Sequence, residues 1–442
     1  FRNMPDKGYG LSKILSVLVI SYLVWILSST QLFAHNRITI ILCLILLTSS
    51  SLFIFFKLQN QILKFFRNSW QLITIYEGIF LLSFIVFLTI RAMNPDLWHP
   101  FRGGEKPMDF AYLNAIVRSI FMPPYDPWFA GKSMEYYYFG HFITGTLIKL
   151  TRVIPSTAYN FAIPTFFALS ASALFSIGYN LVKLSEKINS NKLKQSSGAL
   201  IAGLITLLFG LIIGNFHGLF QVSKMALSVI QQTPITKFDY WAPSRMMPPD
   251  PPGFEITEFP FFSFLFGDLH AHLMAIPLTL LAIGIALNIF INQKSKNRFQ
   301  YIYLSILFLA LVLGSLRITN AWDFPSYFIL GILVIISNQY LIRNNHKYQW
   351  IKQSILLSIL LAMLTLVIWF PYSPDSTTSQ LNLKFTSSNT SIFQFLSING
   401  IFLFSCTIFL LNIFLKTLSS KFISESKIKY FYYLLFILLF TF

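Results

Sequence analysis

The sequence predicts an all-α protein that crosses a membrane many times. Hydrophobic residues make up 55% of the 442 residues and charged residues 11%, and the mean hydropathy is +0.63. Apolar runs of about 17 to 25 residues recur along the chain, which is the length that a helix needs to cross a bilayer. Clusters of Lys and Arg separate these runs, as expected for the inner segments of a multi-pass protein.

The apolar runs predict about 11 spans. With the N-terminus inside, the basic clusters at 57–67, 183–194, 294–298, 343–352 and 416–429 all fall on the inner side. This distribution accounts for the net charge of +17 without nucleic acid, because a nucleic-acid site would need one contiguous basic patch. The spans are expected at about 12–31, 38–56, 71–91, 157–183, 198–214, 269–291, 300–317, 325–341, 351–370, 396–415 and from 430 onward.

One apolar stretch, at 136–150, is expected not to span. It is short, and Gly140, His141 and Gly145 interrupt it. If it crossed, the lysines at 183–194 would lie outside. We therefore expect a half-helix that lies at the outer face of the membrane.

Two features of the chain exclude other classes. Its two cysteines, Cys43 and Cys406, lie far apart inside apolar runs and indicate neither a disulfide framework nor a metal site. The chain has no Walker loop, no GxGxxG, no HExxH and no GxSxG motif.

The chain begins at Phe1 and ends inside an apolar run, so we expect it to be part of a longer protein.

The stretch 258–277 is the most informative, because it places Asp268, His270 and His272 at the mouth of an apolar run. Ionisable residues at a membrane helix are costly and usually mark a functional site. The alternative is that these side chains lie just outside the membrane and are simply solvated. If the helix includes them, Asp268 and His272 share one face, and His270 points elsewhere.

Two long loops are expected on the outer side, where most of the acidic residues fall. In the first, at 92–135, the apolar period predicts a helix over 110–121 that lies along the interface, with Asp109 at or near its N-cap. Asp109 is therefore either a cap or a reactive acid. The second loop, at 215–257, is rich in Pro and aromatic residues and is expected to be ordered.

The short outer segment 317–325 has two interpretations. Arg317 and Trp322 are typical of an interfacial anchor. Alternatively, Arg317 contacts a phosphate or a sugar, since its guanidinium offers a rigid donor fork. Glu77, within the third span, is interpreted as a polar residue satisfied by packing.

Several segments together resemble a known family. They are NPDLWHP at 94–100, EKPMDF at 105–110, EYYYFGH at 135–141, EFPFFSFLFGDLHAH at 258–272 and RITNAWDFP at 317–325. In this order they look like the YYY membrane-protein family, a domain of unknown function with a Tyr triplet. That family is similar, more loosely, to the C-type membrane glycosyltransferases, which include protein O-mannosyltransferases and lipid A aminoarabinose transferases.

The resemblance implies a C-type glycosyltransferase-like helical bundle with three parts: 1–70, a core at 71–341 with outer loops 92–156, 215–268 and 317–325, and 342–442. It implies transfer of a sugar from a polyprenyl-phosphate donor to an acceptor at the outer face. The match places Asp109 or Glu105 as the first-loop acid, with Glu135 and Asp268 as further acids. The expected substrate-binding residues are Tyr136, Tyr137, Tyr138, His141, Arg245, Glu258, His270, His272, Arg317, Asn320, Trp322 and Asp323.

Two further interpretations stay open. Asp268 and His272 offer ligands for a divalent metal ion, with Glu105 or Glu258 as a further ligand. The polar pocket could also belong to a transporter, a flippase or a lipid-binding protein without catalysis. The expected partners are the lipid bilayer and the polyprenyl-phosphate sugar donor.

Overall fold

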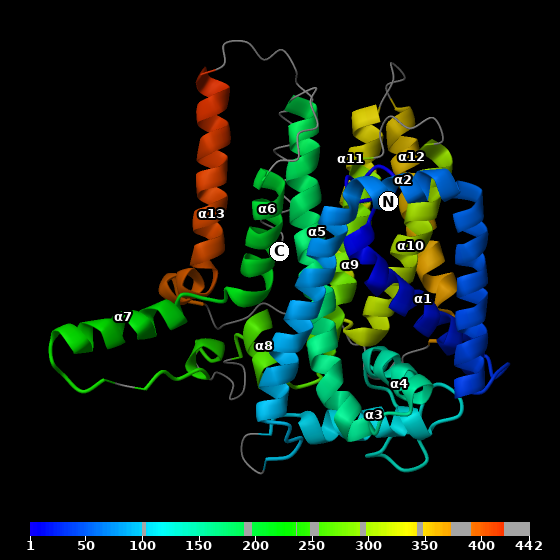
Figure 1. Cartoon of the computed structure of the whole chain (residues 1–442), viewed down its shortest axis with the longest axis horizontal. Helices are drawn as coiled ribbons and strands as arrows, with labels where there is room; N and C mark the ends of the chain where they lie inside the picture. Colours follow the sequence, from blue (N-terminus) through cyan, green and yellow to red (C-terminus); the bar gives the residue numbers. More distant parts are fainter. Residues whose placement is uncertain are drawn as a thin grey trace. The chain divides into compact units, whose positions relative to one another are not determined.

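The computed structural model (Figure 1) describes residues 1–99, 103–189, 197–235, 237–247, 256–291, 298–342, 348–372 and 390–419. Within these residues the named elements are all helices, joined by turns and loops. Most elements are α-helices; η1 is a π-helix and η2 a 3₁₀ helix. They are α1 (Tyr9–Ser29), α2 (Arg37–Met93), α3 (Lys106–Arg118), α4 (Phe139–Thr151), α5 (Pro155–Asn189), α6 (Ser197–Leu207), η1 (Leu208–Ile212), α7 (His217–Ile230), η2 (Ala242–Ser244), α8 (Pro260–Phe266), α9 (Ala271–Ile291), α10 (Arg298–Thr319), α11 (Asp323–Ile342), α12 (Gln349–Ile368) and α13 (Ile392–Ser419).

The chain divides into two compact units. Unit 1 comprises Phe1–Leu207 and Gly267–Ser379, and unit 2 comprises Leu208–Phe266 and Gln380–Phe442. Unit 1 therefore contains α1 to α6 and α9 to α12, whereas unit 2 contains η1, α7, η2, α8 and α13. The three-part division expected from the sequence stays a prediction.

The described helices confirm an all-α multi-pass membrane protein. Within the described residues, eight helices are long and apolar enough to cross a membrane, or nine if the bent pair Ser197–Ile212 and His217–Ile230 forms one span. Ten of the eleven expected spans coincide with these helices when α2 is counted as two spans. The eleventh, from 430 onward, lies outside the described residues.

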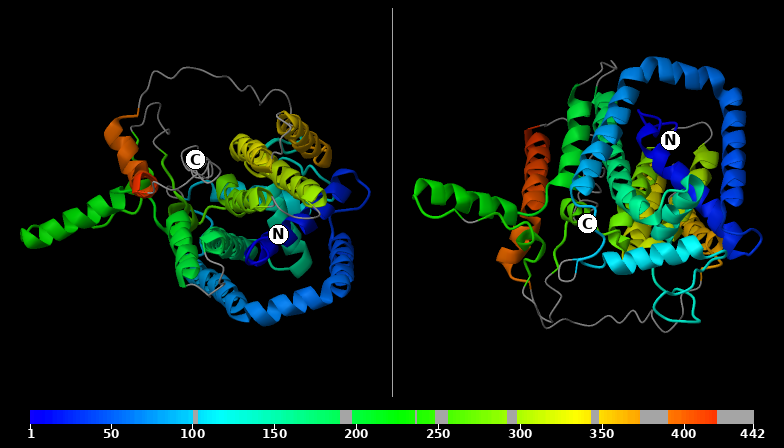
Figure 2. Two further views of the ribbon diagram at one scale, coloured as in Figure 1. Left: turned by 90° about the horizontal axis from the view of Figure 1, so that it is seen from above. Right: turned by 60° about the horizontal axis from the view of Figure 1, so that its bottom comes forward.

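α2 accounts for the difference between these counts. Its 57 residues would extend roughly 85 Å as a straight helix, far more than the about 30 Å of a hydrocarbon core. The backbone leaves helical geometry at Leu58 and Ser69, and Figure 2 shows that α2 turns back on itself in an inverted U. The expected spans 38–56 and 71–91 are its two arms.

The core of unit 1 forms around α5, which packs against α1, α2, α6 and α9. Side chains of α2 and α5 interlock there, with Tyr76 and Phe175 both buried and their rings 5.1 Å apart. α1 approaches them closely at Gly10, where a Cβ atom would lie 2.5 Å from Tyr76 and 2.6 Å from Ser176. Glycine is therefore required for this contact.

One end of unit 1, which we call the site end, gathers α3, α4, the start of α5 and the start of α9 (Figure 1). α4 has 13 residues, too few for a span, which agrees with the expectation that 136–150 does not cross. α3 is displaced from the expected range 110–121 and begins at Lys106. Pro107 explains the early start, because proline favours the first turn of a helix.

Candidate functional site

The centre of the site end is Asp109, a fully buried carboxylate in the first turn of α3. His141 of α4 places its Nε2 atom 3.4 Å from Asp109 Oδ1, and His270 places its Nδ1 atom 3.7 Å from Asp109 Oδ2. Within the described residues, neither oxygen of Asp109 has a hydrogen-bond partner. Asp109 is thus not the N-cap of this helix. Two imidazoles face its oxygens, at distances beyond good hydrogen-bond geometry.

Glu105 is the solvent-accessible carboxylate of this cluster. It occupies the N-cap position of α3 without a side-chain capping bond, and its side chain is 55% exposed. Its Oε2 atom lies 2.8 Å from His270 Nδ1. On the other side of that ring, the hydroxyl of Tyr136 lies 3.4 Å from Nε2. His270 therefore connects the acids of α3 to the tyrosine triplet.

Asp268 joins the cluster from the segment before α9. Its Oδ2 atom accepts a hydrogen bond of 3.0 Å from the Glu105 amide, and its Oδ1 atom accepts one of 3.4 Å from the Tyr159 hydroxyl. Tyr159 in turn accepts a bond of 2.7 Å from the Leu269 amide. The buried tyrosine of α5 thus fixes the backbone and the carboxyl of this segment together.

A glycine turn leads into this segment. Gly267 has φ +69°, and a Cβ atom there would lie 2.7 Å from Nη1 of Arg91. Both observations require glycine, because the conformation is left-handed and the guanidinium is close. Arg91 is held in turn by Asn160, whose side-chain oxygen accepts bonds of 2.9 and 2.6 Å from it.

The cluster separates the pKa values of its two aspartates. Burial raises the pKa of Asp109, but the interactions with His141 and His270 outweigh burial and lower it to about 2. Burial, together with the close approach of the charged Asp109, raises the pKa of Asp268 to about 8. At neutral pH one carboxyl is therefore ionised and its neighbour protonated, which is the arrangement that like charges at close range produce.

His270 and Glu105 complete the charge distribution. Burial lowers the pKa of His270, but Asp109 and Glu105 together raise it to about 10. The hydrogen bond with His270 lowers the pKa of Glu105 below its ordinary value. Lys106 is buried beside them, and burial lowers its pKa. At neutral pH the site thus holds two carboxylates, one neutral carboxyl and one imidazolium.

This geometry corrects the helical spacing assumed for the second half of the site. α9 begins at Ala271, so Asp268 and His270 precede the helix and the i, i+4 relation of Asp268 to His272 does not apply. His270, which was expected to point elsewhere, makes the contacts with Glu105 and Asp109. His272 is exposed, and its ring lies 5.1 Å from that of His270.

The corrected spacing also removes the basis for the metal pair of Asp268 and His272. Within the described residues, no group of three or more His, Cys, Asp or Glu side chains is arranged as a metal site. The close pairs found here are carboxyl with imidazole and carboxyl with carboxyl. This geometry therefore gives no support for a bound divalent ion.

The tyrosine triplet divides between site and core. Tyr136 stacks on Tyr112 at 5.1 Å and reaches His270. Tyr137 packs against Tyr136, also at 5.1 Å. Tyr138 is buried and accepts a hydrogen bond of 3.0 Å from the Trp25 indole. Glu135, just before them, is exposed, and its role stays a prediction.

The segment 317–325 shows features of an anchor. Trp322 is 77% exposed. Asn320 donates a hydrogen bond of 2.9 Å to Asp323, and the Arg317 guanidinium lies 5.3 Å from the centre of the Tyr372 ring. An exposed Trp beside an Arg on an aromatic ring fits an interfacial belt. The phosphate role of Arg317 stays a prediction.

Arg245 and Glu258 belong to unit 2. They form an ion pair of 3.1 Å with each other, and the Arg245 guanidinium lies 4.5 Å from the Trp241 ring. The positive charge of Arg245 is thus already balanced by Glu258. Its expected contact with a donor phosphate stays a prediction.

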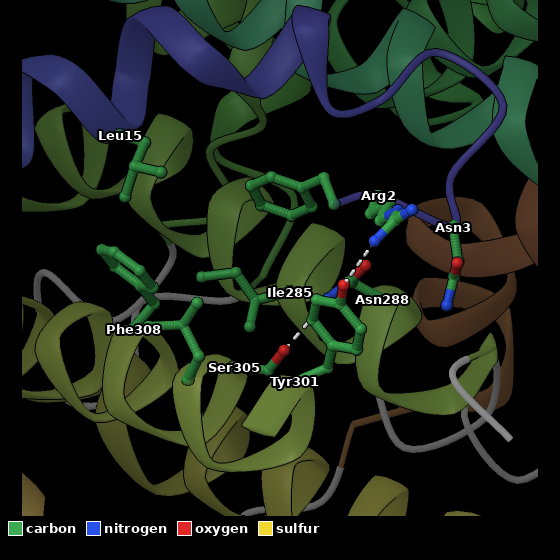
Figure 3. Close-up of a pocket in the computed structure, with 10 residues that line it drawn as sticks. Arg2, Asn3, Leu15, Ile285, Asn288, Tyr301, Ser305 and Phe308 are labelled. Carbon is green, nitrogen blue, oxygen red and sulfur yellow. Dashed lines mark hydrogen bonds between the residues drawn. The ribbon is translucent and has the colours of Figure 1, made fainter. Parts of the chain in front are cut away.

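A separate cavity of about 110 Å³ lies among α1, α9 and α10 (Figure 3). Its polar groups bind one another: Arg2 donates to the Tyr301 hydroxyl at 2.8 Å, and Asn288 donates to Ser305 at 3.0 Å. Asn288 is some 17 residues along α9 from its start at the site, or roughly 26 Å. This cavity contains none of the expected site residues.

Sequence reasoning missed three residues that build the site. They are Tyr159, Lys106 and Arg91. Lys106 lies in the segment EKPMDF, but nothing in that segment marks the lysine, and no motif or period distinguishes Tyr159 or Arg91. Tyr159 lies within an apolar helix, and Arg91 occupies the last turn of a span, where a basic residue is ordinary. Only the fold brings them to Asp268.

Helices and site together define a class: a multi-pass α-helical membrane protein with a buried acid–imidazole cluster at one end. Residues 19–442 match the family of uncharacterized membrane proteins designated DUF2298, and the chain belongs to this family. No curated protein and no solved structure matches it. The resemblance to C-type glycosyltransferases therefore stays a prediction.

Proposed function

We propose that this protein is a membrane glycosyltransferase that transfers a sugar from a polyprenyl-phosphate donor to an acceptor hydroxyl at the outer face of the membrane. One observation carries this proposal: an accessible, ionised carboxylate, Glu105, lies 2.8 Å from an imidazolium, His270. Group transfer between a hydroxyl and a phosphate ester needs a base for the hydroxyl and a positive charge for the phosphate.

Glu105 is the base in this mechanism. It takes the proton of the acceptor hydroxyl as the oxygen attacks the anomeric carbon, and the bond from that carbon to the phosphate oxygen breaks. The electron pair leaves with the polyprenyl phosphate. The lowered pKa of Glu105 makes it a weak base but keeps it ionised, so the proton moves late, when the attacking oxygen has become acidic.

His270 is partly exposed, with 22% of its side chain accessible. Its charge stabilises the phosphate as the leaving group departs. Asp109 has no exposed surface, so it is a positioning residue that keeps His270 charged and oriented. Of the two candidates for the first-loop acid, Glu105 is therefore the base, because only the exposed acid can reach a substrate.

Asp268 is the uncharged carboxyl group beside Glu105. It is protonated at neutral pH, since its pKa is about 8, and it accepts a hydrogen bond from the Glu105 amide. This bond fixes the start of α3, where the base is located. Asp268 therefore orients Glu105 without adding a second negative charge beside the phosphate.

The pair of carboxyls of Asp109 and Asp268 also favours a second function, proton-coupled transport. Asp109 and Asp268 differ in pKa by several units, as in a proton relay of a transporter. The cluster lies at one end of unit 1, whereas transporter sites usually lie near the bilayer midplane. Its position therefore favours transfer chemistry.

The test uses purified protein in vesicles with a panel of polyprenyl-phosphate-linked sugars. Release of polyprenyl phosphate, measured by mass spectrometry, is expected from wild type and not from Glu105→Gln. The matched control is Asp96→Asn, an exposed acid of the same loop that is expected to retain turnover. Proton-driven flux without release of polyprenyl phosphate from any donor would show that the protein is a transporter.

A further inference from the structure

α7, in unit 2, combines a narrow polar stripe with a broad apolar face. Its sequence, HGLFQVSKMALSVI, places polar residues at successive spacings of four, three and four, which align on one side of a helix. The stripe consists of His217, Gln221, Lys224 and Ser228. The remainder is apolar except for Gly218 and Ser223, and no residue of α7 is buried.

The polar stripe is the side that contacts the rest of the chain. Gln221 donates a hydrogen bond of 2.8 Å to the Asp239 carbonyl and accepts one of 2.8 Å from the Asp239 amide. It also lies 3.2 Å from Nδ1 of His217. The segment that returns from α7 is thus bound to the polar stripe.

The apolar face is left exposed as a consequence. In a helix at the surface of a water-soluble domain, the apolar face packs inward and the polar face meets solvent. α7 has the reverse arrangement. The large exposed side chains are Leu219, Phe220, Val222, Leu227, Val229 and Ile230, of which Ile230 is 77% accessible.

The start of α7 is fixed at the end of a span. The Phe216 amide donates a hydrogen bond of 2.8 Å to the carbonyl of Ser397, in the second turn of α13, and Phe220 stacks on Phe393 at 6.3 Å. α13 is long and apolar enough to cross the membrane, so its first turns lie near a bilayer surface. Figure 1 shows α7 extending across that end of α13.

We infer that α7 is an interfacial helix whose apolar face is buried in the acyl-chain boundary of the bilayer, with the return segment at Asp239 on its headgroup side. The occupant of this face is lipid, because the face begins at the first turns of α13, which is long and apolar enough to cross the membrane. Lys224 stands in the polar stripe, where anionic headgroups are accessible. This inference does not depend on the proposed enzymatic activity.

The experiment measures depth along α7 in the whole chain. Cys43 and Cys406 are replaced by Ala, and single cysteines are introduced as Val222→Cys and Ala226→Cys on the apolar face or Lys224→Cys on the polar stripe. Each carries an environment-sensitive fluorophore and is reconstituted into vesicles of phosphatidylcholine and phosphatidylglycerol. A lipid with a headgroup quencher, a lipid with a quencher deep in the acyl chain, and aqueous iodide are then compared.

The ratio of quenching by the headgroup-labelled lipid to quenching by iodide is expected to be at least about two-fold higher at positions 222 and 226 than at position 224. Stronger quenching by the deep lipid would overturn the inference, because α7 would then be a re-entrant helix. Iodide quenching at all three positions would place the face in water. Protection of 222 and 226 from every quencher would show that protein covers it. Each variant is compared with the parent chain by gel filtration, so that only folded protein is scored.

Discussion

Two aspartates among the described residues of unit 1 are completely buried, and their surroundings are opposite. Asp6, before α1, accepts hydrogen bonds from the Tyr76 hydroxyl at 2.7 Å, the Ser176 hydroxyl at 2.6 Å and the Gly8 amide at 2.8 Å. Asp109 is equally buried, yet within the described residues its oxygens have no hydrogen bond, and the imidazoles of His141 and His270 face them. Burial alone disfavours the charged form of an aspartate.

The difference indicates what each residue is for. A buried carboxylate with its acceptors filled connects helices, and Asp6 joins the start of α1 to α2 and α5. A buried carboxylate without hydrogen bonds costs stability, and proteins keep such costs mainly at functional sites. Substitutions at the two positions should therefore separate stability from activity.

The largest expected effect is that of Asp109→Asn on turnover. The amide keeps the size but removes the charge that holds His270 protonated, so donor turnover should fall by roughly 10² to 10⁴-fold. Turnover is scored per folded molecule, because removing one partner of a buried charge pair also costs stability.

A pH profile distinguishes positioning from a merely structural role. Without Asp109, the pKa of His270 should fall toward its ordinary value. The loss of turnover at alkaline pH should then begin at a lower pH than in wild type. Near wild-type turnover with an unmoved profile would show that Asp109 takes no part in the chemistry.

Asp6→Ala is expected to have the next largest effect, on stability. It leaves three buried donors without their acceptor, and each such loss costs about 1 kcal/mol or more, so unfolding should become easier by roughly 2 to 4 kcal/mol. Chemical denaturation in detergent measures this change. Turnover per folded molecule should stay as in wild type. A variant that is stable but inactive would contradict the structural role.

The third prediction concerns pH. The pKa of Asp268 is raised from 3.8 to about 8, and that of His270 from 6.5 to about 10. Over each interval the unfolded chain has lost the proton and the folded chain keeps it, so stability falls as pH rises. The two intervals overlap from pH 6.5 to 8.

The apparent melting temperature should therefore drop by a few degrees between pH 6.5 and 8. Asp268→Asn and His270→Gln should each remove part of this slope. The lowered pKa of Asp109 acts in the other direction, with stability lost only as pH falls from 3.8 to about 2. A flat profile in wild type over pH 6.5 to 8 would show that the two raised pKa values are absent in solution.

The sequence predicts the helices of this molecule better than its site. Apolar runs locate spans because length and hydropathy are local properties. The charge pattern also excludes a span at 136–150, where the structure has only the 13 residues of α4. Asp109, Glu105 and Asp268 are recognisable because acids are scarce in such a chain.

Local sequence pattern did not predict which side chains contact each acid. Helical spacing favoured His272, but a non-helical segment before Ala271 turns His270 toward α3 instead. Whether an aspartate accepts three hydrogen bonds or none depends on residues more than 100 positions away, such as Ser176 for Asp6. Local pattern contains no such information, so the sequence predicts the hydrogen-bond partners of neither Asp6 nor Asp109.

The smallest effect is expected at Glu77, a third acid that lies between these extremes. It accepts a hydrogen bond of 2.8 Å from Tyr9 and forms an ion pair of 2.5 Å with Lys13, which confirms that it is satisfied by packing. Its side chain is 46% exposed and that of Lys13 33%. Exposed pairs contribute about 0 to 1 kcal/mol, and glutamine keeps the acceptor for Tyr9. Glu77→Gln should therefore change stability by less than about 1 kcal/mol, measured beside Asp6→Ala in the same detergent. A loss of stability as large as that of Asp6→Ala would contradict this prediction. It would mean that the stability lost on replacing an acid in unit 1 depends on its position in the membrane and not on its hydrogen bonds.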